Sequence, residues 1–495
     1  MALELAEAYL RHLLSKLGLD AEYVRGEGDT LWWRTPEGDL PVTDFVGGYG
    51  SLILGHNHPE LVEHARALLR QRIPVHAQFS YHPYANELAA TLNRVLWREF
   101  DTTEPYAAIF ANTGAEAVEA ALKHAEMDRG LRVATLAAEI DEHVEQARAT
   151  GDPTIECLVA ELREHNARAF AHQPVFLALE GSFHGKLAGS VQLTHSADYR
   201  IPFRGLAAQA RFAPADAVAK IVEEERVAVL DLVVSPQGAL LVERDLPVIA
   251  AFFVEPIQGE GGIHVVGAEV AADIRVAADA GGFPVVVDEV QSGMGRTGAF
   301  FAASHIRLLG DYVLLAKALG GGLAKSSVLL VRQSRYRPDF ELLHSSTFAK
   351  DAFSCNIGLK VLELLEDSGG RAYRQAEERG AALEAALRSV GGEFPDIVAD
   401  VRGRGLMLGL EFHDHTAAAG VIGEFAGNGL FGYLLAGYLL RKHRVRVFPT
   451  ASASHTLRFE PSLGISDAQI EQLASGLRAV CSILRAQDGT ALLPA

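Results

Sequence analysis

The chain has 495 residues, of which 49% are hydrophobic and 22% are charged, a composition typical of a globular protein with room for two or three domains. Its 45 basic and 63 acidic residues give a net charge of −18, which disfavours nucleic acid and anionic membranes as partners. The three cysteines lie far apart in no metal-binding spacing, and no apolar run is long enough to span a bilayer. We therefore expect a cytoplasmic protein without disulfide bonds.

The first half of the chain predicts a helix, short strands and then an alternation of both. MALELAEAYLRHLLSKLG has the spacing of an amphipathic helix and lacks the basic start of a signal peptide. Strands are predicted at TLWWRT (30–35) and LPVTDFV (40–46). From about 105 to 340, helical stretches separate the apolar runs AAIFAN, PVFLALE, AAFFVEP, FPVVVDEV and DYVLLAK. Such runs predict a mostly parallel sheet with helices on both faces.

Two stretches interrupt this alternation. Residues 128–172 have helical apolar spacing and charged faces, which predicts an insertion of two helices, and residues 233–247 are expected to be irregular. After about 360 a helical segment, short strands and a last helix indicate a separate α+β unit. The predicted boundaries are 1–75 for an N-terminal part of a small domain, 76–340 for a large domain that contains the insertion, and 341–495 for the rest of the small domain.

Two glycine-rich segments resemble nucleotide-binding motifs but lack their context. GMGRTG (293–298) has the spacing of the dinucleotide fingerprint, yet the polar DEVQS separates it from the preceding strand. GGGLAKSS (320–327) resembles a phosphate-binding loop, but Ala324 replaces the glycine required before the lysine. A nucleotide-binding protein built on the same alternating sheet is therefore the weaker hypothesis.

Polar residues follow four of the predicted strands, where ligands of parallel sheets gather. Lys317 ends the run DYVLLAK before three glycines, and Asp288 follows three valines. Residues 112–114, Asn-Thr-Gly, open a predicted helix whose N-terminus offers N–H groups to a phosphate. GSFHGK places Phe183 beside His184. Each feature alone has an ordinary explanation as a strand end, a helix cap or a core aromatic.

One cofactor needs all four features together. Pyridoxal phosphate (PLP) requires a lysine for its Schiff base, an acid facing its pyridine nitrogen, a helix N-terminus for its phosphate and a flat side chain against its ring. The acid keeps the ring nitrogen protonated, so that the ring can take up carbanion electrons. On this interpretation the glycines after Lys317 leave room for the ring and the substrate.

The motifs follow the order of a known family: DFVGGYG…GHNHP, NTGAEAVEAALK, SFHGK, VEPIQGEGG, VVVDEVQSGMGRTG, LLAKALGGG, HSSTF, VRGRGLMLGLEF and LRFEPSL. On these motifs the chain resembles the class III (ornithine, acetylornithine and GABA-type) aminotransferases of PLP fold type I. The resemblance runs from about Leu31 to the last predicted helix, without the two interrupting stretches. It implies an α/β fold with a mostly parallel central sheet covered by helices, in the large PLP-binding domain, plus a smaller α+β domain built from both termini.

The resemblance assigns roles to individual residues. Lys317 would form the Schiff base, Asp288 would face the pyridine nitrogen, and Gln291 would reach the ring hydroxyl. Phe183, with His184 beside it, would stack on the ring. Thr347 would reach the phosphate of the neighbouring subunit, so the resemblance implies a homodimer with shared active sites. Within the subunit, the phosphate would be held by Thr113, Gly114 and Ala115.

Substrate choice is expected to depend on Arg458 and Glu260. In the family, the arginine of LRFEPSL binds the α-carboxylate of glutamate or 2-oxoglutarate through a two-pronged salt bridge. The glutamate of QGEGG covers this arginine when the other substrate has no carboxylate there. Tyr49 aligns with a tyrosine that members acting on ornithine use. Tyr81 is a further candidate for the pocket, although an ordinary packed tyrosine fits it equally.

The resemblance therefore implies a PLP-dependent aminotransferase working in two ping-pong half-reactions. It would exchange an amino group between glutamate or 2-oxoglutarate and an ω-amine or aldehyde, such as ornithine, lysine, a diamine or a larger biosynthetic intermediate. The alternative on the same fold is an epimerase, an aminomutase or a decarboxylase, which the presence of both Arg458 and Glu260 disfavours. Residues 349–351 and 324–325 depart from the pattern of many relatives, and with the insertion at 128–172 they leave the amine unspecified.

Overall fold

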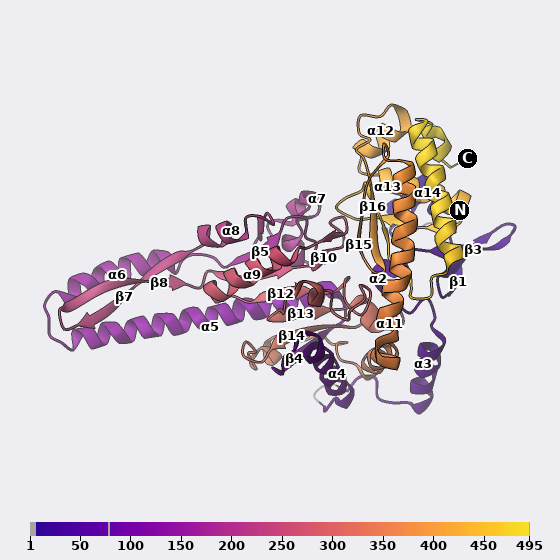
Figure 1. The fold of residues 1–495 in the computed structure, drawn as a ribbon. Helices are drawn as coiled ribbons and strands as arrows, with labels where there is room; N and C mark the ends of the chain where they lie inside the picture. Colours follow the sequence, from indigo (N-terminus) through magenta and orange to yellow (C-terminus); the bar gives the residue numbers. More distant parts are fainter. Residues whose placement is uncertain (1–5, 78–79, 495) are drawn as a thin grey trace.

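The computed structural model describes residues 6–77 and 80–494 (Figure 1). A central sheet lies in the middle of the molecule, a tall layer of helices and small sheets stands on one side of it, and a long arm projects from the other side. None of the helices in these two ranges is long and apolar enough to cross a membrane.

The central sheet confirms the prediction of mostly parallel strands. Its strands β13, β12, β9, β5 and β6 run parallel to one another, and β14 runs antiparallel to both of its neighbours. Across the sheet the order is β4 (Tyr106–Ala111), β14 (Ser327–Arg332), β13 (Tyr312–Leu315), β12 (Val285–Asp288), β9 (Ile249–Val254), β5 (Val175–Leu179) and β6 (Arg211–Ala213).

The two faces of this sheet are buried in separate hydrophobic cores. Alternate residues of a strand point to opposite faces. Val286 packs in the core that includes α5 (Gly114–Arg148), whereas Val285 packs in the core that includes α9 (Ala268–Gly281). By the same alternation, Asp288 at the end of β12 lies on the face that α5 covers.

A four-stranded sheet, in the order β1, β2, β3 and β17, brings the two ends of the chain together. β17 (Val445–Arg446) runs parallel to β3 (Gly38–Asp44), with Val445 opposite Thr43. This pairing agrees with the predicted small α+β unit built from both termini, while its boundaries at residues 75 and 340 stay predictions. The remaining strands are β1 (Tyr23–Glu27), β2 (Thr30–Thr35), β10 (Ile257–Gln258), β11 (His264–Val265), β15 (Val398–Arg404), β16 (Met407–Phe412), β18 (Phe448–Pro449) and β19 (Thr456–Phe459).

Helix α11 (Ala352–Glu393) connects the lower and upper parts of the tall layer (Figure 1). It begins at Asp351, whose side chain accepts a hydrogen bond from Ser354 N at 2.8 Å. It bends at residues 367–370, where glycines 369 and 370 take positive φ angles. The other helices outside the arm are α1 (Ala8–Leu17), α2 (Gly47–Gly50), α3 (Pro59–Gln71), α4 (Pro83–Phe100), α7 (Ala197–Arg200), α8 (Val218–Glu224), α10 (Phe340–Leu343), α12 (Gly420–Gly427), α13 (Phe431–Tyr438) and α14 (Asp467–Arg485), with the short turns η1 (Ser190–Leu193), η2 (Ile201–Phe203), η3 (Ala302–Ile306), η4 (Lys317–Gly320), η5 (Leu439–His443) and η6 (Gly489–Leu492).

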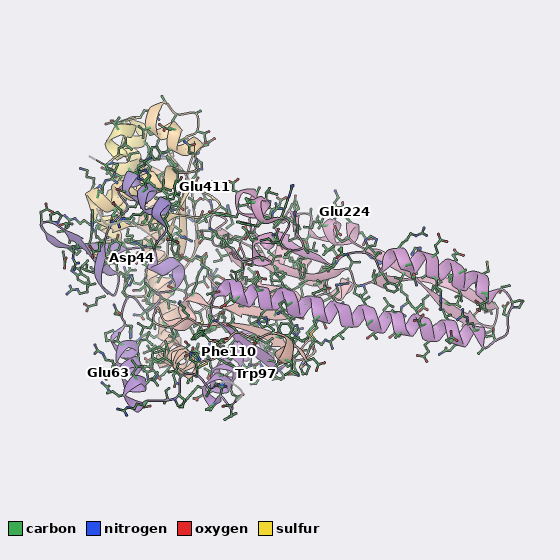
Figure 2. The ribbon with its side chains drawn as sticks, turned by 180° about the vertical axis from the view of Figure 1, so that it is seen from behind. Asp44, Glu63, Trp97, Phe110, Glu224 and Glu411 are labelled. Atoms are coloured by element: carbon green, nitrogen blue, oxygen red, sulfur yellow. The ribbon has the colours of Figure 1, made fainter. Side chains whose placement is uncertain are left out.

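The arm is built from two helices and a β-hairpin around a core of its own. α5 runs unbroken from the central sheet to the tip, and α6 (Ile155–Ala169) returns beside it (Figure 2). The hairpin of β7 (Val227–Ser235) and β8 (Gly238–Leu246) lies along both helices. All four elements contribute to the core, which includes Leu136, Ile140, Val144, Val159, Leu162, Val229, Leu232 and Leu246.

Two predictions about the arm need correction. The first of the two helices predicted within 128–172 is not a separate element but the outer part of α5. Gly130 is tolerated inside this helix because the residues before it pack in the core of the central sheet and the residues after it pack in the core of the arm. The prediction of an irregular stretch at 233–247 is wrong, since these residues form the end of β7, the turn and the whole of β8. Val233 and Leu240 near its turn are exposed, whereas Val229 and Leu246 nearer its base are buried, and this difference obscures the alternation of apolar and polar residues along the strands.

Leu232→Ala should loosen the arm without disturbing the central sheet. Leu232 is 1% exposed, and removing its side chain should lower the free energy of opening of the arm by about 2–5 kcal/mol. Hydrogen exchange of the arm amides measures this change, while the amides of β12 should keep their protection. Val233→Ala is the matched control, because Val233 is 40% exposed; equal effects of the two substitutions would contradict a buried core in the arm.

Candidate active site

A cavity of about 270 Å³ lies at the carboxyl ends of the central strands, where parallel sheets place their ligands. Loops that follow β5, β9, β12 and β13 contribute to it, together with the first turn of α5. The structure thus brings most of the predicted cofactor residues together. The lining residues are Gly114, Ala115, Phe183, His184, Gly185, Lys186, Glu255, Glu260, Asp288, Val290, Gln291 and Lys317.

Asp288 and His184 form a buried pair at the bottom edge of this site. Asp288 Oδ2 lies 2.8 Å from His184 Nδ1, and Asp288 Oδ1 accepts a hydrogen bond from Val290 N at 3.0 Å. Burial disfavours the charged imidazole, but the hydrogen bond and the charge of Asp288 outweigh it and raise the pKa of His184 above its ordinary value of 6.5. The pair therefore places a hydrogen-bonded carboxyl and imidazole together in a buried position.

Lys317 is held in an unusual backbone conformation at the end of β13. It begins the turn η4 with a φ of +44°, a left-handed conformation that costs energy for a residue with a Cβ. Burial lowers the pKa of its amine below the ordinary value of 10.5, and the nearby carboxylates of Glu460 and Glu260 oppose this effect without cancelling it. A lowered pKa raises the neutral, nucleophilic fraction of the amine.

Two of the three glycines after Lys317 have a different role from the predicted one. At Gly321, with a φ of +58°, a Cβ would lie 2.7 Å from Leu61 Cδ1. At Gly322, with a φ of +75°, a Cβ would lie 2.2 Å from Leu52 Cδ2. Neither leucine lines the cavity, so for Gly321 and Gly322 the interpretation that glycines make room for a ring is wrong. They allow a left-handed turn that packs closely against the hydrophobic core.

Arg458 and Glu260 form the second buried ion pair beside the cavity. Arg458, in β19, is 2% exposed, and its Nη1 donates to Glu260 Oε1. Glu260 Oε2 also accepts a hydrogen bond from Ala451 N at 2.8 Å, and the Arg458 guanidinium lies 4.4 Å from the centre of the Tyr49 ring. Burial opposes both charges, but mutual attraction raises the pKa of Arg458 and lowers that of Glu260. The glutamate therefore covers the arginine, as expected for this pair.

The first turn of α5 presents backbone groups to the cavity. Thr113 Oγ1 accepts a hydrogen bond from Glu116 N at 3.2 Å, and Glu116 Oε2 accepts one from Thr113 N at 2.9 Å, a capping box. Gly114 and Ala115 line the cavity. A Cβ at Gly114 would lie 2.7 Å from Val290 Cγ1, so this position requires glycine. A helix N-terminus of this kind suits an anion.

Five of the predicted residues, among them Arg458 and Tyr49, lie outside the cavity lining. The Thr113 side chain serves as the helix cap, and Thr347 is exposed in the loop after α10. Tyr81 is 81% exposed, which contradicts the alternative of an ordinary packed tyrosine, while its place in the substrate pocket stays a prediction. Tyr49 contacts the site through Arg458.

Sequence reasoning missed three charged residues at the site. Glu255 Oε1 and Oε2 accept hydrogen bonds from Phe183 N at 2.8 Å and Gly259 N at 3.1 Å, and burial raises the pKa of Glu255 to about 7. Lys186 lines the cavity, and Glu460 is fully buried beside Arg458. Each lies in a motif already recognised, VEPIQGEGG, SFHGK or LRFEPSL, and the position of these charges at strand ends was the available signal.

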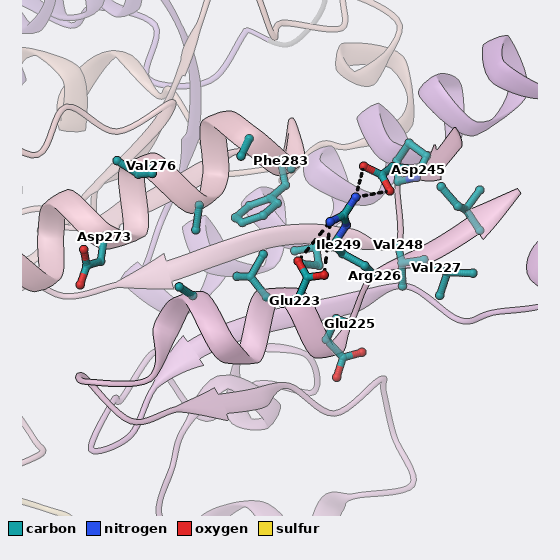
Figure 3. A pocket seen from close by; sticks show the side chains of 17 residues that line it. Glu223, Glu225, Arg226, Val227, Asp245, Val248, Ile249, Asp273, Val276 and Phe283 are labelled. Atoms are coloured by element: carbon teal, nitrogen blue, oxygen red, sulfur yellow. Dashed lines mark hydrogen bonds and ion pairs between the residues drawn. The ribbon is translucent and has the colours of Figure 1, made fainter. Parts of the chain in front are cut away.

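A larger cavity of about 390 Å³ lies between α8, α9 and the base of the arm (Figure 3). Much of its lining is apolar, and its arginine is already paired: Arg226 Nη2 lies 2.8 Å from Asp245 Oδ1, and Arg226 Nη1 lies 3.1 Å from Glu223 Oε2. The charge of this arginine is therefore neutralised by its two acidic neighbours.

Comparison with known proteins identifies the family that these motifs belong to. The profile of the class-III aminotransferases matches residues 18–481, nearly the whole chain. Among solved structures, the ornithine aminotransferase of Toxoplasma gondii ME49 superposes with a TM-score of 0.69 at 22% identity, covering 98% of this chain and 100% of that one. Another structure of the T. gondii enzyme, with a TM-score of 0.68 at 21% identity, covers 94% of this chain and 92% of that one and has partial occupancy of PLP at its active site.

A transaminase from the marine bacterium Virgibacillus superposes with a TM-score of 0.70 at 20% identity, covering 99% of this chain and 97% of that one. At such identities these likenesses concern the fold. They confirm the prediction of the fold type I architecture, with its mostly parallel sheet.

Asp288→Asn should lower the pKa of His184 from above its ordinary value of 6.5 to below it. Burial, the strongest influence on this imidazole, then acts without the opposing carboxylate. Titration of ring-labelled histidines by NMR in the apoprotein measures the change. His124, whose pKa burial lowers to about 4 and whose ring bonds to Tyr312, is the internal control. A His184 that still titrates above 6.5 in the variant would contradict the pairing.

Proposed function

The chain belongs to the class III aminotransferase family, and on that premise we propose that it transfers an amino group between glutamate or 2-oxoglutarate and an ω-amine or aldehyde. Membership of the family makes it a PLP-dependent transaminase. The proposal adds the substrates, the ping-pong order and the residues that act. The observation that carries it is the buried ion pair of Arg458 and Glu260 beside the Lys317 cavity.

The donor set of the cavity fits PLP: a buried amine, a buried carboxylate and a helix N-terminus meet within about 270 Å³. We propose that Lys317 binds the cofactor covalently and that Asp288 faces its ring nitrogen. Phe183 would lie against the ring, and the N–H groups of Gly114 and Ala115 would hold the phosphate. When bound, PLP supplies the electron sink that stabilises negative charge on a substrate carbon.

The neighbouring side chains support these roles through their charges. Lys317 has a lowered pKa, so that once its amine is released it accepts a proton from the substrate carbon and returns it. His184 hydrogen-bonds to Asp288, and a carboxylate facing the ring nitrogen would keep that nitrogen protonated. Gln291, which lines the same cavity, would reach the ring hydroxyl.

Two cations support glutamate and 2-oxoglutarate as one substrate pair. The planar guanidinium of Arg458 suits the α-carboxylate, and Lys186, which lines the cavity, suits a second carboxylate. Glu260 neutralises Arg458 when the other substrate brings no carboxylate there. Tyr49, stacked on Arg458, favours an ornithine-like amine as that other substrate.

L-Glutamate alone should bleach the visible absorption of the purified holoenzyme, because the first half-reaction leaves the amino group on the cofactor when no oxo acid is present. Arg458→Gln should keep the visible band but need about 100-fold more glutamate, since removing one partner of a buried charge pair costs about 2–5 kcal/mol. Glu260→Gln should respond to glutamate at least as readily as the wild type, because the competing carboxylate is gone. Titration of the absorption spectrum with glutamate measures all three.

Lys317→Ala is the control, because it removes the amine that would form the Schiff base, and it should support no transfer. A coloured protein that ignores glutamate but reacts with another amine would overturn the assignment of Arg458 and Glu260. Epimerisation, decarboxylation or an internal amino shift of the donor, without transfer to an oxo acid, would favour the alternative chemistries on this fold.

We also propose that the active enzyme is a homodimer in which Thr347 reaches the phosphate site of the neighbouring subunit. Two large apolar side chains are exposed near Thr347, Leu343 at the end of α10 and Phe348 in the same loop, which supports burial by another chain. Phe348→Asp should shift the mass from about twice 53.2 kDa towards 53.2 kDa and weaken PLP binding, as measured by light scattering and absorbance. Leu131→Asp, at an exposed position of the arm, should change neither, and a monomeric wild type would contradict the proposal.

A further inference from the structure

Glu460 is a buried acid inside the proposed active site that none of these roles uses. It follows β19, two residues after Arg458, and is 0% exposed. Its Oε2 lies 3.4 Å from Gln291 Nε2 and 4.0 Å from Arg458 Nε. Within the described ranges its Oε1 has no hydrogen-bond partner, although burying an unpaired carboxylate oxygen is costly.

The terminal amide atom of Gln291 that faces Glu460 also faces three other groups. It lies 3.4 Å from Tyr49 O, 3.1 Å from Lys317 Nζ and 3.3 Å from Arg458 Nη1. Two of its neighbours are therefore oxygens, and two are cationic donors. A carboxamide presents either its NH₂ group or its oxygen at this position, and a half-turn of the amide exchanges them.

The charge of Glu460 selects between these two orientations. An NH₂ group at this position donates to Tyr49 O and to an ionised Glu460, but it faces the N–H groups of Lys317 and Arg458. An oxygen accepts from both cations, but it repels Glu460 unless that carboxyl carries a proton and donates it. The orientation of the Gln291 amide and the proton on Glu460 are therefore linked.

Charged groups from several elements face Glu460, and burial outweighs them. Burial raises the pKa of Glu460, while nearby cations lower it and Glu260 raises it further. Arg296 donates its Nη hydrogens to the carbonyl oxygens of Leu406, Pro461 and Gly50 rather than to Glu460. The charged neighbours are Arg458 in β19, Arg296 after β12, Lys317 in η4 and Glu260 after β10.

We propose that Glu460 is a positioning residue for Gln291. When ionised, it holds the Gln291 carboxamide with the NH₂ group towards Lys317 and the ring oxygen of the bound cofactor; when protonated, it lets the amide turn its oxygen there. The first arrangement gives the ring oxygen a donor, whereas the second places two acceptors face to face. This inference rests on the proposed contact between Gln291 and the ring hydroxyl.

Glu460→Gln tests the inference, because it keeps the shape of the side chain but cannot ionise. At a pH where wild-type Glu460 is ionised, the variant should bind PLP about tenfold more weakly, the effect of losing one charge-assisted contact. The two affinities should converge as the pH falls and Glu460 takes up a proton. In a Gln291→Ala background, Glu460→Gln should change the affinity by less than about twofold. Titration of the apoprotein with PLP across pH measures each affinity.

Asp29→Asn is the matched control. Asp29 is also a buried acid close to Arg296, but its oxygens accept hydrogen bonds from Ser462 N at 2.7 Å and Ser462 Oγ at 2.6 Å rather than from Gln291. Its removal should leave the affinity for PLP unchanged. Glu460→Asp keeps the charge but withdraws it from Gln291, so this variant should bind PLP as weakly as Glu460→Gln.

Three results would overturn the inference: a loss of affinity in Glu460→Gln that is the same at every pH, a loss that persists when Gln291 is absent, or a Glu460→Asp variant that binds like the wild type. A Gln291→Ala variant that binds PLP as tightly as the wild type would instead defeat the proposed contact of Gln291 itself. The two failures are therefore distinguishable.

Discussion

Charges buried around Lys317 must be balanced by protein groups, because the site excludes most of the water that would otherwise solvate them. Asp288 is balanced by His184, and Arg458 by Glu260. The two members of each pair come from distant parts of the chain, so each pair is also a tertiary contact. The Arg458–Glu260 pair joins β19, in the tall layer, to the loop after β10, beside the central sheet. Contacts at the site therefore help to fix the position of the tall layer relative to the central sheet.

Residues at the ends of apolar strands were predictable from the sequence. Lys317 and Asp288 interrupt long apolar runs, and the alternation of a strand fixes the face to which each end residue points. The start of α5 was equally predictable from the sequence, because Thr113 and Glu116 have the spacing of a capping box. Local rules decide these features, and they need no knowledge of distant residues.

Features that depend on distant contacts escaped prediction. Gly321 and Gly322 are needed because leucines from another part of the chain pack closely against them. The hairpin at 227–246 is stabilised by helices that are far away in the sequence. Glu460 gives no local sign of its burial, because its neighbours Arg296 and Gln291 belong to another loop. The pairing of Arg458 with Glu260 was anticipated only because whole motifs resembled a family.

The unbroken course of α5 fixes the arm to the first turn beside the cavity. An α-helix rotates by about 100° per residue, so one residue added between Gly114 and Leu136 would swing the apolar stripe of the arm away from its hairpin. Insertions of about seven residues, close to two full turns, restore the phase. The number of residues in α5 between the cavity and the core of the arm can therefore change only in steps close to whole helical turns. In related proteins that have such an arm, we expect α5 to differ in length by these steps rather than by single residues.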